Sequence, residues 1–72
     1  MEQYTVYRRD FPQDTFLAAP GSTARVLDFC SAVDRVEGQT ARDAAQVYLD
    51  KEGLRFQKMV TVAPGVYQLF TH

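Results

Sequence analysis

The sequence has little of what catalysis and metal binding require. It contains one histidine, the terminal residue His72, one cysteine, Cys30, and no tryptophan. A single cysteine excludes an intramolecular disulfide, and with it the disulfide-stapled class of small secreted domains. A nucleophilic Cys30 would need a neighbouring base, and no interior histidine supplies one. We therefore expect a non-enzymatic chain with no catalytic residues, no metal site and no cofactor.

Long apolar runs and an excess of one charge are also missing. Eight basic and nine acidic residues give a net charge of −1, which lacks the overall basic character typical of nucleic-acid-binding domains. No apolar run approaches the roughly 18 residues of a membrane span. The first ten residues are strand-like and lack the apolar stretch of a signal peptide. The expected location is the cytoplasm, away from membranes.

The clearest element that is present is a helix predicted at Thr40–Gly53. The 46% hydrophobic content of the chain is enough for one packed domain over residues 1–72. Thr40 can cap the N-terminus of the helix, with Asp43 three residues later. Gly53 can end the helix in a left-handed conformation, and Leu54 could then pack back on Leu49. Five residues at helical spacing form a small apolar face that the rest of the chain should cover: Ala41, Ala44, Ala45, Tyr48 and Leu49.

Four segments predict β-strands because β-branched and aromatic residues dominate them and turn residues separate them. Asp10–Asp14, with Pro12 at its centre, predicts a turn that joins the first two strands as a hairpin. Pro64-Gly65 fits a turn between the last two. The predicted strands are Gln3–Arg9, Thr15–Ala19, Arg55–Ala63 and Val66–Thr71.

The segment Thr23–Val36 is ambiguous. Val26, Phe29 and Cys30 begin a helical spacing that continues to Val36, whereas strict alternation fails, so a helix is favoured. The alternative is a strand at Ala32–Glu37 that runs directly into the Thr40 helix. The favoured interpretation predicts an α+β domain in the order β-β-α-α-β-β, with an antiparallel sheet of about four strands packed on a helical hairpin. In this arrangement Cys30 is buried as a small hydrophobic residue.

Two groups of residues are candidate binding sites. If the first and third predicted strands are neighbours, four cations share one end of the sheet and suit an anionic ligand: Arg8, Arg9, Arg55 and Lys58. Paired carboxylates such as Asp10 and Asp14 are commoner as turn residues than as acid–base catalysts, and we assign them no catalytic role.

The second candidate is a face of the sheet, because both side-chain parities of the last two strands are apolar and two helices cover only one face. We assign Val60, Val62, Val66 and Phe70 to the helix side. The outward residues would then bind a second copy of the chain or another protein, and they are Met59, Tyr67 and Leu69. With the opposite parity, Val60 and Phe70 are the exposed set.

A helical hairpin that leads through Gly53 into the hairpin at APGVYQLF resembles the end of a winged-helix domain. The resemblance covers roughly the last half of the chain, and there is no room for a recognition helix before the wing. What it implies is an alternative function in nucleic-acid binding, through the helices or the arginine-rich sheet end. The principal hypothesis remains a small protein-interaction or assembly module that associates with itself.

Overall fold

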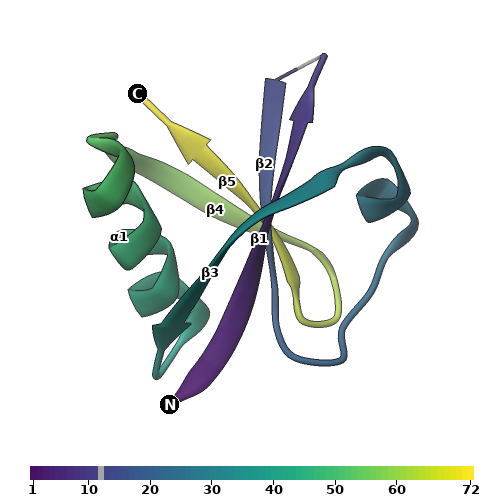
Figure 1. Ribbon diagram of the computed structural model, residues 1–72, viewed down its shortest axis with the longest axis horizontal. Coiled ribbons are helices and arrows are strands. Elements are labelled where there is room, and N and C mark those ends of the chain that lie inside the picture. Colours follow the sequence, from purple (N-terminus) through teal and green to yellow (C-terminus); the bar gives the residue numbers. More distant parts are fainter. Residues whose placement is uncertain (12) are drawn as a thin grey trace.

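The computed structural model describes residues 1–11 and 13–72, and within them the chain forms one five-stranded antiparallel sheet, one α-helix and one short 3₁₀ helix (Figure 1). The predicted α+β class is confirmed, but the order is β-β-β-α-β-β with a single α-helix. The elements are β1 (Glu2–Asp10), β2 (Gln13–Ala18), η1 (Arg25–Phe29), β3 (Ser31–Gly38), α1 (Ala41–Glu52), β4 (Phe56–Ala63) and β5 (Val66–Thr71).

Helix α1 forms as its sequence predicts. The hydroxyl of Thr40 accepts a hydrogen bond from the backbone N–H of Asp43 at 3.1 Å, which satisfies one of the free donors of the first turn. Gly53 adopts a left-handed conformation, and the N–H of Leu54 bonds to the carbonyl of Leu49 at 3.0 Å, which closes the last turn. The five residues of the predicted apolar face are the five buried residues of the helix.

The sheet has the strand order β3-β1-β2-β5-β4. The two predicted hairpins, β1–β2 and β4–β5, are present and are joined by antiparallel pairing of β2 with β5. The central residue of the first turn, Pro12, lies outside the described residues. Strand β3 adds to the free side of β1, so β3 and β4 are the two edges.

The helix favoured over Thr23–Val36 is wrong, and with it the helical hairpin that the winged-helix resemblance requires. Only the five residues of η1 are helical there, and β3 follows at Ser31. The strand alternative is the correct one. A bulge explains why alternation failed: Val6 pairs with Asp34 but Tyr7 pairs with Ala32, so Val33 is an extra residue that reverses the parity of the strand.

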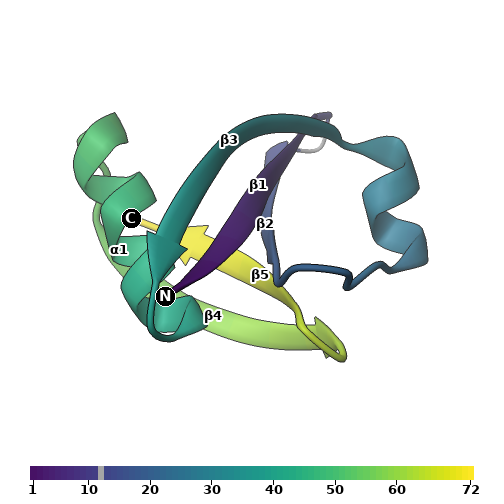
Figure 2. The ribbon, with the colours of Figure 1, turned by 60° about the horizontal axis from the view of Figure 1, so that its bottom comes forward.

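Different parts of the chain lie against the two faces of the sheet (Figure 2). On one side the helix packs on Tyr4, Val6, Leu17 and Val36 in a single buried cluster. On the other side, away from α1, lies the segment 19–30 with η1. The residues buried outside the helix cluster are Phe16, Ala18 and Val66.

The turn between β4 and β5 is held against that second covering segment. The carbonyl of Gly65 accepts a hydrogen bond from the N–H of Ala19 at 2.8 Å. Gly65 has φ +74°, and a Cβ there would overlap the side chain of Ser22, so glycine is required both by the turn and by the close approach.

Within the described part of the chain, neither helix has the length and apolar character that a membrane-spanning helix needs.

Candidate functional site

The sheet face predicted for partner binding faces the helix instead. Leu69 is only 4% exposed and belongs to the helix cluster, and Met59 and Tyr67 pack against that cluster. The outward orientation assigned to these three residues is therefore wrong. Strand sequence alone could not decide the parity, because both parities are apolar and the choice depends on which face α1 covers.

The exposed apolar residues of β4 and β5 come from the alternate set of strand positions, those that do not face the helix. Val60 and Val62 are each 42% exposed, and Phe70 is partly exposed. The ammonium of Lys58 lies 4.9 Å from the centre of the Phe70 ring, a cation–π arrangement that covers one face of the aromatic. We call Lys58, Val60, Val62 and Phe70 the β4 surface.

The β4 surface borders a free sheet edge. Among the described residues β4 pairs with β5 alone, so its other side presents unpaired backbone groups. Register shifts lie between Phe56 and Lys58 and between Thr61 and Ala63. The regular part of this edge is therefore the short run from Lys58 to Thr61.

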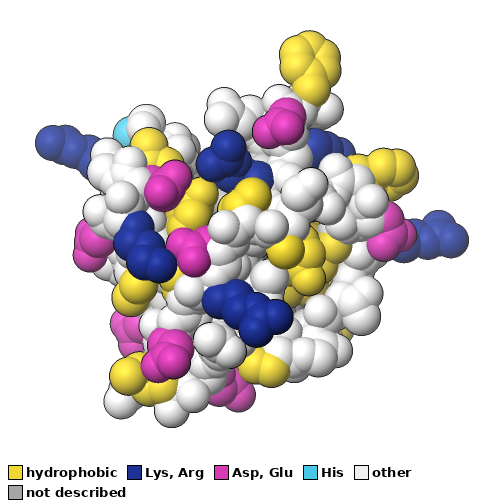
Figure 3. Space-filling model, viewed as in Figure 1, with side chains coloured by type: hydrophobic (Ala, Val, Ile, Leu, Met, Phe, Trp, Pro, Cys, Tyr) yellow, Lys and Arg dark blue, Asp and Glu magenta, His cyan; other side chains and the backbone are white. Residues whose placement is uncertain are grey.

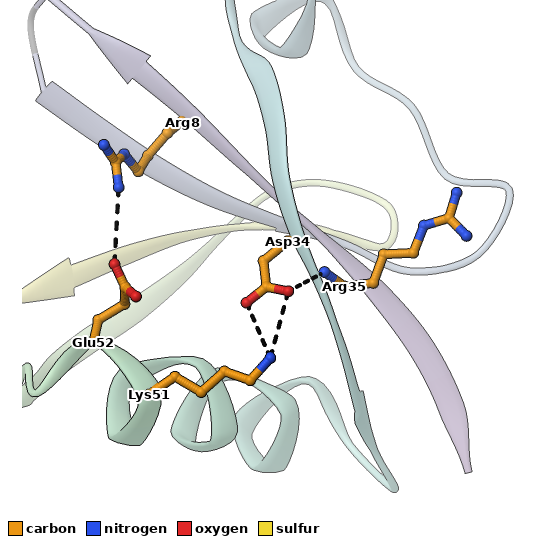
Figure 4. Close-up of polar contacts among 5 residues, drawn as sticks. All are labelled: Arg8, Asp34, Arg35, Lys51 and Glu52. Atoms are coloured by element: carbon orange, nitrogen blue, oxygen red, sulfur yellow. Dashed lines mark hydrogen bonds and ion pairs between the residues drawn. The ribbon is translucent and has the colours of Figure 1, made fainter.

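The four predicted cations lie at one end of the sheet but do not form a joint patch. The end of β1 carries Arg8 and Arg9, and the start of β4 carries Lys58 just after Arg55, but β2 and β5 separate the two strands. Arg9 pairs with Asp14, whereas Arg8 reaches toward Glu52 at the end of α1, with Nη1 and Oε1 4.0 Å apart (Figure 4). Successive residues of a strand point to opposite faces, which explains why the adjacent arginines diverge.

Arg8 lines a cleft of about 300 Å³ at this end of the sheet. Residues from β2, β5 and α1 surround it, including Gln13, Tyr48 and Thr71. The contact with the Tyr48 phenol is the largest cause that raises the pKa of Arg8 above its usual value. The sequence did not indicate this cleft, because its walls come from elements far apart in the chain and no motif links them.

Asp34 ties β3 to the helix. Its carboxylate accepts hydrogen bonds from the backbone N–H of Arg35 at 2.7 Å and from Nζ of Lys51 at 3.2 Å (Figure 4). These two donors, the backbone N–H first, lower the pKa of Asp34 below its usual value. The Arg35 side chain points away from the pair.

The remaining candidates have structural environments. Cys30 lies between η1 and β3 rather than in a helix, is partly exposed, and donates its S–H to the carbonyl of Val26 at 3.4 Å. Burial raises the pKa of its thiol. Asp14 accepts hydrogen bonds from Arg9 and Gln68. No group of acidic, histidine or cysteine side chains in the described part of the chain could hold a metal ion.

Charges of both signs alternate on the face seen in Figure 3, with no continuous region of Lys and Arg. Comparison with protein-family models, with curated proteins and with solved structures finds no match to this chain. The argument for function therefore rests on the surfaces themselves.

Proposed function

We propose that this protein is a non-enzymatic interaction module that associates with a second copy of itself through the β4 surface. The observation that supports this most is the pair of half-exposed valines, Val60 and Val62, on an edge strand. A β-branched apolar residue on the exposed face of an edge strand invites pairing unless charge or Pro protects it. Lys58 is the only charged residue within β4.

The sequence of β4 suits antiparallel pairing with its own copy. If the two-fold axis passes beside Val60, this residue faces the Val60 of the second copy and Met59 faces its Thr61. The two Lys58 ammonium groups then stay about 14 Å apart along the strands, at about 3.4 Å per residue. Cross-strand β-branched pairs contribute favourably, and like charges do not oppose each other. A net charge of −1 opposes association of two copies only weakly.

The size of the available surface limits the strength of this association. A stable interface buries roughly 800 Å² on each partner, which is about one sixth of the 4674 Å² of accessible surface of this chain. The regular run of β4 is short, so the outward face with Phe70 must contribute to reach that area. We therefore expect a weak dimer whose population depends on concentration.

The experiment is light scattering over a concentration series with Val60→Glu and a matched control, Val33→Glu. Val33 is 45% exposed and lies on the other edge strand, β3, so both variants add the same charge to a similarly exposed valine. We expect Val60→Glu to remain monomeric at concentrations where the wild type and Val33→Glu dimerise. A wild type that is monomeric throughout contradicts the proposal.

The alternative function, nucleic-acid binding, has less support because the four cations are separated and three of them already have partners, Glu52, Asp14 and the Phe70 ring. It predicts an affinity for generic DNA or RNA that falls steeply with salt. Such binding, together with a monomeric wild type, would favour the alternative over self-association.

A further inference from the structure

We propose that the cleft beside the C-terminal end of α1 binds a small molecule bearing a carboxylate, with Arg8 as its anchor. The cleft lies at the end of the sheet between β2, β5 and α1 and shares only Phe70 with the β4 surface, so ligand binding there can be tested separately from the proposed self-association. Its evidence is the state of one guanidinium group and the chemistry of the walls around it.

The guanidinium of Arg8 is incompletely paired. Its Nε is buried and has no hydrogen-bond partner among the described residues. The Nε of Arg9 is in the same state, but Arg9 does not line the cleft. Its contact with Glu52 is made through Nη1 at 4.0 Å, the outer limit of an ion pair. Buried donors in folded proteins are nearly always satisfied, so an orphaned one calls for an acceptor. Nε itself is covered, but the side chain as a whole is 37% exposed, so a ligand approaches the guanidinium through its exposed Nη atoms.

A carboxylate fits this guanidinium better than a neutral acceptor does. Its two oxygens can accept in parallel from two N–H groups of the guanidinium, which is the bidentate geometry that arginine offers and lysine lacks. The cleft adds polar groups from Gln13 and Thr71 and apolar walls from Leu54 and Phe70. Its volume of about 300 Å³ is at the lower end for ligand pockets, which limits the ligand to a small molecule.

The charges nearby favour a monoanion over a phosphate dianion. Glu52 lies beside Arg8, and Asp14 also lines the cleft. Asp14 is compensated by Arg9, so the charge left uncompensated around Arg8 is small. A second negative charge on the ligand would meet repulsion from Glu52 without a second cation in the cleft to offset it.

The test follows the arginine Nε–H signals of ¹⁵N-labelled full-length protein by NMR during titration with N-acetylglycine, its methyl ester and inorganic phosphate. N-acetylglycine carries a carboxylate on a small amide, and the ester keeps the same framework with one added methyl group and no charge. We expect a saturating shift of the Arg8 signal with N-acetylglycine and none with the ester. Arg8→Lys should weaken binding by about tenfold or more. Arg35→Lys should bind as the wild type does, because Arg35 does not line the cleft and its side chain points away from Asp34 and Lys51.

Three results would overturn the inference. Equal shifts with the ester would show that charge recognition is not involved. Shifts shared by every arginine without saturation would show only adventitious ion binding. Tighter binding of phosphate than of N-acetylglycine would contradict the choice of a carboxylate. If Arg8→Lys does not fold, the wild-type titration decides alone, because it reports on Arg8 Nε directly.

Discussion

Gly38 and Ala44 approach so closely that no side chain fits between them. A Cβ at Gly38 would lie 2.5 Å from the backbone N of Ala44 and 3.0 Å from its Cα. Gly38 is the last residue of β3, and Ala44 is in the first turns of α1. The helix therefore packs backbone to backbone against the strand that leads into it, and this contact fixes the helix on the sheet.

Gly38→Ala should be strongly destabilising because the atoms it would overlap are backbone atoms that cannot rotate away. We expect a loss of about 2–3 kcal/mol in the free energy of unfolding, as for overpacking in a core. The control is Gly21→Ala, at φ +75° with no atom within 4 Å of the new Cβ, which should cost about 1 kcal/mol for the left-handed conformation alone. Urea unfolding of both variants measures the difference, and equal losses would show that the close contact is not rigid.

Ala45→Asp should unfold the domain or nearly so. Ala45 is completely buried at the centre of the helix face, and an unpaired charge there costs several kcal/mol against a total stability of roughly 5 kcal/mol. Val47→Asp, on the 41%-exposed side of the same helix, is the matched control and should fold. Thermal melts decide, and a shift of Ala45→Asp no larger than that of the control would mean that the helix face is not packed on the sheet.

The stabilising contribution of Asp34 should be lost in acid. Because its pKa is lower in the folded state, its contribution is complete above the ordinary aspartate pKa of about 4 and is lost as the pH falls below it. Asp34→Asn should lose less stability than the wild type between neutral pH and about pH 3. Asp28→Asn, which removes an exposed carboxylate on η1, should retain the wild-type pH dependence. The same pH dependence in Asp34→Asn as in the wild type would refute this role.

Cys30 should react slowly with thiol reagents in the native protein and rapidly in denaturant. Its S–H is engaged with the Val26 carbonyl, and burial raises the thiol pKa, so the reactive thiolate is scarce. Because the residue is partly exposed, we expect slowed labelling rather than complete protection. Native labelling as fast as in denaturant would show that η1 does not cover the thiol.

The helix and four of the strands could be predicted from the sequence because their signals are local. Thr40 and Gly53 mark the helix ends, and the apolar residues between them recur at one period. The strand β3 could not be predicted with the same certainty, because the extra residue Val33 breaks its alternation and its stability comes from pairing with β1, which is distant along the chain.

The candidate site was harder to predict than the fold. The parity of β4 and β5 depends on which face the helix covers, so the sequence alone assigns Met59 and Leu69 to the outer face although they face the core. The cations were expected on neighbouring strands, yet β2 and β5 lie between Arg8 and Lys58. The first outcome depends on which face the helix covers and the second on the order of the strands, and both are long-range properties that no local pattern encodes.

Disulfide trapping tests self-association through β4 most directly. In a Cys30→Ser background, Val60→Cys places one thiol on each chain beside the proposed two-fold axis, where opposed strand residues have Cα atoms about 4.5–5.5 Å apart, within disulfide range. Val33→Cys in the same background is the matched control on the other edge. We predict that mild oxidation at a concentration where the wild type dimerises converts Val60→Cys, and not Val33→Cys, to a covalent dimer with the native fold. Equal or absent cross-linking of the two variants would contradict the proposed interface.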